Sequence, residues 1–242
     1  MLVALIADIH GNLTAFEAVI ADFGSPDEVW CLGDTVGFGP DPDECVERLR
    51  GLNPVCVAGN HDWAVIGKLS TEGFNADAAS SVAWTSLNIS QSTRDYLLSL
   101  PTNLRRNNLT LVHGSPRDPI NEYLFHPAVA VTTLDHLTTK HCLVAHTHVP
   151  AVFYLNPAAR RADVTHPAPG EEIAMNGDRL VINPGSVGQP RDGIPDARYI
   201  ILDTDKDTFS YRRVPYDVAR TQEKMGRYGL PARLAYRIAA GV

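Results

Sequence analysis

Short apolar runs alternate with segments of helical periodicity along the first sixty residues. The runs at residues 3–7, 28–32 and 54–58 are mostly apolar and strand-like, and each is followed by glycine or a charged residue. Between them, apolar residues recur at helical spacing over residues 13–23, and residues 42–52 show a second helical pattern. Because parallel strands need crossover connections, usually helices, this alternation predicts a parallel sheet.

The pattern changes after residue 75. Two helical segments are expected between residues 75 and 100, as a helical insert. Beyond them the pattern predicts strands, with Asn176-Gly177-Asp178 as a hairpin turn. The expected strands cover residues 109–112, 142–145, 151–155, 180–182, 199–202 and 208–214.

A parallel half followed by a mostly antiparallel half predicts the fold class α/β (α+β). We expect an αββα four-layer sandwich in which two mixed β-sheets are flanked by helices. The length of 242 residues fits a single domain over residues 1–242, with the helical insert inside it. Because 44% of the residues are hydrophobic, such a domain can form its core without disulfides or a structural metal.

Charge, cysteines and the N-terminal segment narrow the classes of partner and compartment. The formal net charge of −7 argues against broad attachment to nucleic-acid polymers or anionic membranes. Cys31, Cys45, Cys56 and Cys142 contain no CxxC pair, so we interpret them as reduced core residues. The N-terminal apolar run has no basic segment before it and is too short to cross a bilayer, which predicts a cytoplasmic protein.

Polar motifs follow directly after five of the strand-like runs. Since the carboxyl ends of parallel strands meet at one edge of a sheet, side chains far apart in sequence can form one site there. The motifs are Asp8-Ile9-His10, Gly33-Asp34, Gly59-Asn60-His61-Asp62, His113-Gly114 and His146-Thr147-His148. Carboxylates, one amide and several imidazoles form a mixed oxygen and nitrogen ligand set, which suits transition metals better than calcium or a thiolate zinc site.

Seven of these side chains are candidate metal ligands, which is too many for one tetrahedral ion but suitable for two ions. They are Asp8, His10, Asp34, Asn60, His113, His146 and His148. We expect two divalent metal ions, manganese first, with iron, zinc, nickel or cobalt as alternatives. Asp34 is the expected bridge between them. The other histidines, His126, His136, His141 and His166, have no partner motif and are interpreted as surface or loop residues.

The motifs D-x-H, G-D, G-N-H-D, H and A-H-T-H resemble, in this order, those of the calcineurin-like metallophosphoesterase superfamily, with Ala145 where glycine usually stands. Residues 33–42, 113–118 and 182–192 resemble its small bacterial phosphodiesterase-like members. The resemblance implies the αββα fold and two metal sites that share Asp34 and leave His61 free. It assigns Asp8, His10, Asp34 and His148 to the first metal, and Asp34, Asn60, His113 and His146 to the second.

The expected function is a dinuclear metal-dependent phosphoesterase, above all a phosphodiesterase that hydrolyses a small phosphodiester or nucleotide. A metal-bridging hydroxide would attack phosphorus in line, and His61 would act as general acid for the leaving alkoxide. Asp62 could orient the His61 ring, or point away into solvent.

Several residues are candidates for binding the substrate. Arg117 and Arg191 could clamp a non-bridging phosphate oxygen or a second phosphate, although each could instead pair with the acidic residue beside it. Ser186 and the neighbouring amides could form an anion-binding nest, or an ordinary turn. Phe38 and Tyr123 could stack on a base, or belong to the core or the rim of the site.

Other functions stay open at this point. A catalytically silent scaffold or binding protein is the alternative of another class, and phosphomonoesters or dinucleoside polyphosphates are alternative substrates. A metal-dependent amidohydrolase would need eight βα repeats, which the chain lacks. The expected partner is a small-molecule phosphate ester. Neither a membrane nor a nucleic-acid polymer is expected, and a homo-oligomer is left open.

Overall fold

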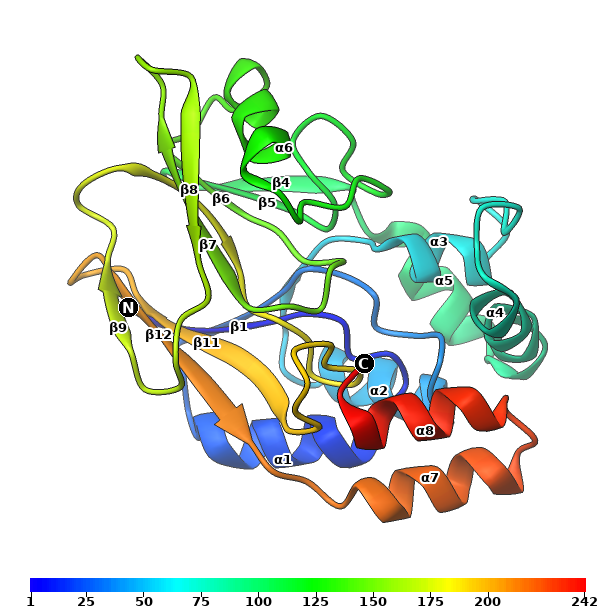
Figure 1. Ribbon diagram of the computed structural model, residues 1–242. Helices are drawn as coiled ribbons and strands as arrows, with labels where there is room; N and C mark the ends of the chain where they lie inside the picture. The colour runs from blue at the N-terminus through cyan, green and yellow to red at the C-terminus, as the bar shows by residue number, and fades with distance from the viewer.

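The computed structural model describes residues 1–242, and two six-stranded mixed sheets form its centre (Figure 1). The first sheet has the strand order β3-β2-β1-β11-β12-β9, in which β1, β2 and β3 are parallel and the others antiparallel. Its strands are β1 (Leu2–Ile6), β2 (Glu28–Cys31), β3 (Val55–Cys56), β9 (Glu172–Ala174), β11 (Ala197–Asp203) and β12 (Thr208–Val214).

The second sheet has the order β4-β5-β6-β10-β7-β8, with β5, β6 and β10 parallel. Its strands are β4 (Asn103–Arg106), β5 (Leu109–Val112), β6 (His141–Leu143), β7 (Ala151–Asn156), β8 (Arg161–Thr165) and β10 (Arg179–Asn183). The helices are α1 (Leu13–Phe23), α2 (Pro42–Arg50), α3 (Asn60–Val65), α4 (Ala76–Asn88), α5 (Gln91–Ser99), α6 (Pro127–Thr132), α7 (Val218–Arg227) and α8 (Ala232–Ala240), with a 3₁₀ turn at Thr133–Asp135.

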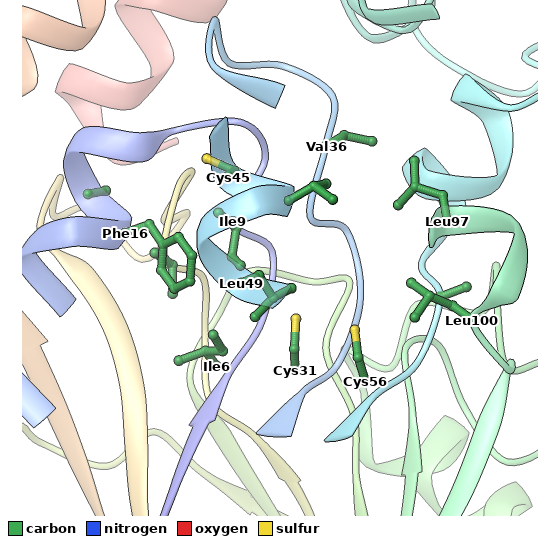
Figure 2. Packing of buried hydrophobic residues seen from close by; sticks show 14 of the residues in the cluster. Ile6, Ile9, Phe16, Cys31, Val36, Cys45, Leu49, Cys56, Leu97 and Leu100 are labelled. Atoms are coloured by element: carbon green, nitrogen blue, oxygen red, sulfur yellow. The ribbon is translucent and has the colours of Figure 1, made fainter. Parts of the chain in front are cut away.

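Apolar side chains on both faces of β1 explain why its sequence is continuously hydrophobic. Val3 and Leu5 belong to the core between the two sheets, whereas Ala4 and Ile6 face the layer of α1 and α2. Figure 2 shows this helix-side core around Ile6 and its neighbours. Helix α1 contacts β11 and β12, and α6 covers β7 and β8 on the second sheet. The predicted αββα sandwich is therefore confirmed.

The four cysteines are buried and free of disulfides, as expected for core residues. No helix has both the length and the apolar character needed to cross a membrane. Helices α4 and α5 lie within residues 75–100, where the sequence indicates a helical insert.

The predicted hairpin at Asn176-Gly177-Asp178 is wrong. This turn connects β9 in the first sheet to β10 in the second, so the flanking strands do not pair with each other. An Asn-Gly step favours a tight turn, but the pairing of each strand depends on which sheet edge it reaches. Consecutive strands do pair antiparallel at β4–β5, β7–β8 and β11–β12.

His141 is also placed differently from the prediction, because it is buried in β6 instead of lying on the surface. Its Nδ1 accepts a hydrogen bond from the backbone N–H of Leu180 at 3.1 Å. Burial, with the positive charges of Lys140 and Arg179, lowers the pKa of His141 to about 4. The ring is therefore a neutral acceptor inside the fold.

This histidine should make the protein sensitive to acid. Below pH 6.5 the unfolded chain binds a proton at His141 that the folded chain refuses, so stability falls between about pH 6.5 and pH 4. A His141→Asn variant keeps an acceptor for Leu180 but does not titrate, so its melting temperature should fall less over this range. His136→Asn, at an exposed position, is the control. Equal acid sensitivity of the wild type and His141→Asn would contradict the assignment.

Candidate metal centre

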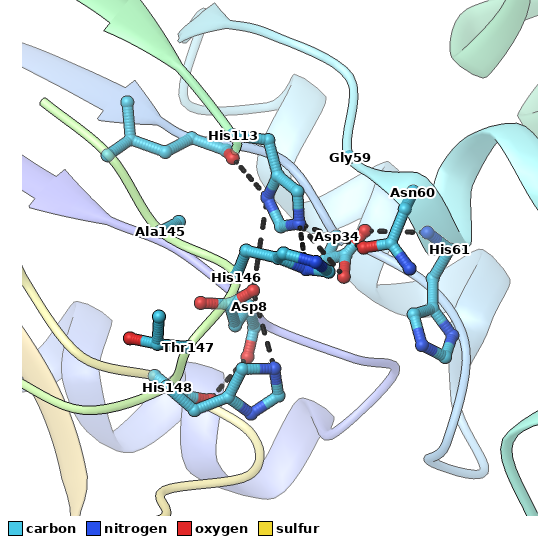
Figure 3. Close-up of polar contacts among 12 residues, drawn as sticks. Asp8, Asp34, Gly59, Asn60, His61, His113, Ala145, His146, Thr147 and His148 are labelled. Atoms are coloured by element: carbon cyan, nitrogen blue, oxygen red, sulfur yellow. Dashed lines mark hydrogen bonds and ion pairs between the residues drawn. The ribbon is translucent and has the colours of Figure 1, made fainter. Parts of the chain in front are cut away.

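The predicted ligands come together at one edge of the two sheets, in loops that follow their parallel strands (Figure 3). Asp8 and His10 follow β1, Asp34 follows β2, and His113 follows β5. The remaining three candidates are Asn60, at the start of α3, and His146 and His148, in the loop after β6. All seven are almost completely buried, so their polar atoms face one another and the pocket instead of bulk water.

The side chains form two groups that share one carboxylate. Asp8, His10, Asp34 and His148 offer ligand atoms within 4.8 Å of one another, and so do Asp34, His113 and His146. The amide oxygen of Asn60 lies 3.0 Å from Nε2 of His113, beside the second group. The first group has the members of the first set that the resemblance implies, and the second group has those of the second set apart from Asn60, with Asp34 in common.

Backbone carbonyls determine which ring nitrogen of each histidine is available. Nδ1 of His10, His113 and His148 lies 3.1, 2.8 and 2.6 Å from a backbone carbonyl oxygen. Because a carbonyl only accepts, these Nδ1 atoms carry the proton and each Nε2 presents a lone pair to the site. His146 is oriented the other way, with Nε2 3.2 Å from the carbonyl of Asn121 and Nδ1 facing inward.

The inward-facing nitrogen and oxygen atoms could all serve as metal ligands. Nε2 of His10 and Nε2 of His148 are 3.1 Å apart, and Nε2 of His113 is 3.1 Å from Nδ1 of His146. Both carboxylate oxygens of Asp8 and Oδ2 of Asp34 are buried without a hydrogen-bond partner. Buried lone pairs at these distances repel unless a cation lies among them. The residues present therefore fit two metal ions.

Burial and charge perturb the acids and bases of the two groups. Burial raises the pKa of Asp8 to about 8, against the influence of His113. Burial also acts to raise the pKa of Asp34, but His113, His61 and His10 outweigh it and hold this pKa well below its usual range. Burial alone would lower the pKa of His113, yet Asp34 raises it to about 9. A cation that binds here competes with the protons on Asp8 and His113.

The backbone at the ligands adopts a conformation that side chains other than glycine rarely take. Asp8, His10, Asp34, His146 and His148 have φ values of 54°, 51°, 53°, 67° and 62°. Such left-handed conformations cost energy and cluster at functional sites, where surrounding contacts enforce them.

A glycine makes the close packing around the shared carboxylate feasible. A Cβ atom at Gly59 would lie 2.0 Å from Oδ1 of Asp34, so no larger residue fits at this position. The G-N-H motif therefore has a steric reason for its first residue as well as a chemical reason for its second.

Asp62 does not orient His61, which corrects the expectation from the sequence. Its Oδ2 accepts the backbone N–H groups of Asp34 and Gly59 at 2.9 and 3.0 Å. Its Oδ1 accepts those of Thr35 and Val36 at 2.9 and 3.2 Å. The carboxylate is also fully buried, so it does not point into solvent either. Asp62 instead holds the loop that presents the shared carboxylate.

An Asp62→Asn variant should lose stability. An amide at this position directs two donors at backbone N–H groups that also donate, so about 3 kcal/mol of unfolding free energy should be lost. Urea denaturation monitored by circular dichroism measures this loss, with the exposed Asp163→Asn as control. A loss below about 1 kcal/mol would contradict the anchoring role.

His61 lies beside the two groups without belonging to either. Its backbone N–H donates to Oδ1 of Asp34 at 2.8 Å. The ring packs against Phe38 and Phe74, with centroids 4.3 and 5.1 Å away, and lies 4.8 Å from the ring of His10. Its Nδ1 is buried without a hydrogen-bond partner, and burial lowers its pKa to about 4. His61 is therefore a titratable group next to the ligands with no protein partner for its ring.

A pocket of about 450 Å³ opens onto this centre. His61, Asp34 and Asn60 line it, together with Arg191 and Tyr123. Arg191 therefore reaches the pocket, where its guanidinium could contact a phosphate. Tyr123 stacks on the ring of His146, with centroids 3.7 Å apart, and on Phe125 at 5.5 Å.

Several residues predicted to bind substrate lie outside the pocket or form hydrogen bonds within the protein instead. Arg117 does not line the pocket and pairs with Glu122 at the surface. Ser186 is fully buried, and its hydroxyl donates to the carbonyl of Asp8 at 2.9 Å. The N–H of Val187 donates to the carbonyl of Ala7, and the N–H of Gly185 donates to Oδ1 of Asn183, so neither amide is free to form the expected anion-binding nest.

The two aromatic residues expected to stack on a base also have other contacts. Phe38 is almost fully buried between His10 and His61, and both neighbours of Tyr123 lie parallel to its ring. Phe38 therefore belongs to the buried part of the site, whereas Tyr123 is 47% exposed at the rim of the pocket. The histidine contacts of both rings come from distant segments of the chain.

One lining residue, Arg237 on α8, is absent from the sequence interpretation. No motif marks it, and it follows the last strand by more than twenty residues, so only the packing of α8 reveals its position.

Comparisons with known proteins identify the family of this chain. The sequence profile of the calcineurin-like phosphoesterase superfamily domain matches residues 1–207. An uncharacterized protein of Methanocaldococcus jannaschii is 37% identical over 249 residues, which cover 99% of this chain and 98% of that protein. The chain belongs to the calcineurin-like phosphoesterase superfamily, whose members typically bind divalent metal ions.

Two crystal structures share the fold. A metallophosphoesterase from Sphaerobacter thermophilus is 44% identical with a TM-score of 0.92, and the match covers 100% of this chain and 99% of that one. A hypothetical protein from Pyrococcus horikoshii has a TM-score of 0.77 at 20% identity, covering 100% and 98% of the two chains. Both similarities extend over the C-terminal helices as well as the sandwich.

Proposed function

We propose that this protein is a dinuclear metal-dependent phosphodiesterase that hydrolyses a small phosphodiester or nucleotide. The observation that carries the proposal is the pair of ligand groups that share Asp34, with His61 beside them in the same pocket. Asp8, His10 and His148 would complete the first metal site, and Asn60, His113 and His146 the second. Manganese is the first metal proposed, with iron, zinc, nickel or cobalt as alternatives, because a mixture of carboxylate, amide and imidazole ligands suits all of these ions.

Two bound cations would supply an activated water as nucleophile and neutralise charge on the phosphoryl oxygens. The protein's own contribution begins with ligand orientation. Carbonyls that accept from Nδ1 of His10, His113 and His148 hold each Nε2 toward the site. The left-handed loops keep both carboxylates within the same small volume.

His61 is the proposed general acid for the leaving alkoxide. Its ring lines the pocket, is free of both ligand groups and has no protein partner at Nδ1. Phe38 and Phe74 restrict its position, so the ring can be aimed at a leaving group without a hydrogen bond to hold it. A phosphate anion beside the ring favours the imidazolium, which opposes the lowering of its pKa by burial.

The direct test is a phosphate-ester panel run with manganese, nickel, magnesium, zinc and no added metal. We expect hydrolysis of bis(p-nitrophenyl) phosphate that depends on added metal and exceeds that of p-nitrophenyl phosphate. Metal content is measured on the same samples. A protein that binds two ions and hydrolyses no ester would instead be a scaffold, and a preference for monoesters would overturn the diesterase assignment.

A further inference from the structure

Two guanidinium groups project into the pocket beside the metal ligands. Arg191 comes from the loop after β10, and Arg237 comes from α8, which lies at the end of the chain. The only acidic side chain among the lining residues is Asp34, which already belongs to both ligand groups. The pocket therefore has a cationic wall, although the chain as a whole carries a formal net charge of −7.

Arg191 is held in the pocket without an acidic partner. One terminal amino group donates to Oε1 of Gln189 at 2.8 Å, and the guanidinium carbon lies 5.9 Å from the centre of the Phe38 ring. Its Nε is buried and has no hydrogen-bond partner. Leaving such a donor buried and unpaired is costly, so a ligand that accepts from it would be stabilised.

Like Arg191, Arg237 forms no ion pair with an acidic side chain. Its Nε donates to the backbone oxygen of Val242 at 2.8 Å, and the carboxylate that acts on its charge, Asp77, is paired with Arg233 at 3.6 Å instead. Burial lowers the pKa of Arg237, and the positive charge of Arg191 lowers it further. Two cations that repel each other at one pocket wall are stabilised by an anion between them.

The position of Arg237 is fixed by the packing of α8. Leu234 and Ile238 on the same helix are buried in one cluster with Phe38, the residue that also packs against His61. The N–H of Gly193, two residues after Arg191, donates to the carbonyl of Gly241 at the end of α8 at 2.9 Å. Figure 1 shows the end of α8, in red, beside the loops at this edge of the sandwich. The two arginines are therefore held on a connected scaffold.

We propose that Arg191 and Arg237 bind a second phosphate of the substrate, so that the preferred esters carry one phosphate in addition to the one being cleaved. This inference rests on the proposed phosphodiesterase function and specifies its substrate class. A guanidinium fork matches phosphate oxygens in geometry as well as charge. The pocket volume of about 450 Å³ lies within the range of small-molecule sites and exceeds what one phosphate group needs.

The test compares two esters that differ by one phosphate and release the same chromophore. They are thymidine 5′-(4-nitrophenyl phosphate) and the same compound with an added 3′-phosphate. For the metal-loaded wild type, we expect kcat/KM to be about 10–100-fold higher for the ester with the 3′-phosphate. In Arg237→Gln this ratio should fall toward one, and Arg237→Lys should retain part of it.

Arg233→Gln is the matched control, because Arg233 lies one turn earlier on α8 but is exposed and paired with Asp77 at 3.6 Å. Its ratio should equal that of the wild type. Calorimetric titration of the purified wild type and variants with thymidine 3′,5′-bisphosphate and with thymidine 5′-phosphate gives a readout independent of turnover. Arg237→Gln should weaken only the preference for the bisphosphate.

The outcomes separate the two proposals. If neither ester is hydrolysed with any metal, the phosphodiesterase function fails, while the calorimetric preference still tests the arginine pair. If both esters are hydrolysed but the wild type has no preference, or Arg237→Gln and Arg233→Gln leave the same preference, the second phosphate site is overturned.

Discussion

An Asp34→Asn variant is expected to lose metal from both ligand groups and to lose its phosphoesterase activity with it. Asp34 is the only side chain that the two groups share. Its Oδ1 accepts the backbone N–H of His61 at 2.8 Å, whereas its Oδ2 is buried without a partner among the other ligands. In the variant, the amide oxygen would keep the bond to His61, so the NH₂ group would point at the metals.

An N–H donor then takes the place of a charged acceptor, so metal affinity should fall at both sites. The loss should exceed the reduction of about 10–100-fold that follows when a ligand loses the group hydrogen-bonded behind it. Elemental analysis of the purified protein gives the number of ions per chain. Asp8→Asn is the matched comparison, because Asp8 belongs only to the first group and its variant should retain one ion. The exposed Asp163→Asn should retain both. Two ions per chain in Asp34→Asn would refute the shared role of this carboxylate.

A His61→Gln variant is expected to keep its metal and to lose about 10²–10⁴-fold in kcat. Glutamine has a similar length and polarity, and the backbone N–H that donates to Asp34 is unchanged. What the variant cannot do is deliver a proton to the leaving oxygen. The loss should therefore be larger for an alkyl ester, whose alkoxide is a poor leaving group, than for a nitrophenyl ester.

Steady-state kinetics with both esters, together with metal content, measure this difference. His126→Gln, at an exposed position away from the pocket, is the control and should behave like the wild type. An equal loss for the two leaving groups would indicate that His61 only positions the substrate. Undiminished turnover of the alkyl ester would remove it from the mechanism.

The ligand motifs could be predicted because each one directly follows a strand that is visible in the sequence. Val3 to Ala7 is apolar at every position since both faces of β1 are buried, and Asp8 then marks the end of the strand. Parallel strands place their carboxyl ends at one edge, so the meeting of Asp8 and Asp34 follows from topology. The same reasoning applies to His113 and His146 after β5 and β6 of the second sheet.

The partners of several polar residues could not be predicted, because they come from segments far away along the chain. Asp62 lies next to His61 in sequence, yet it binds backbone groups of residues 34–36, in the loop after β2. The hydroxyl of Ser186 donates to the carbonyl of Asp8, and Arg117 forms an ion pair with Glu122. Hydrogen-bond directions depend on side-chain rotamers and loop paths, which sequence periodicity does not specify.

The packing of the C-terminal helices α7 and α8 could not be predicted for the same reason. Each helix buries one narrow stripe, Thr221 and Met225 in α7 and Leu234 and Ile238 in α8, and helical periodicity alone does not say which surface that stripe contacts. Their stability comes from docking against Phe38 and its neighbours, a contact between opposite ends of the chain.

The sequence by itself indicated the sandwich class and placed the seven candidate ligands just after strand-like runs, because local periodicity and the position of a polar residue after an apolar run are properties of short segments. The tertiary structure decided that Asp62 anchors a loop, that His141 is buried, and that Arg237 reaches the pocket. Each of these depends on which distant backbone or helix lies opposite the side chain, and that choice is made by the packing of the whole chain.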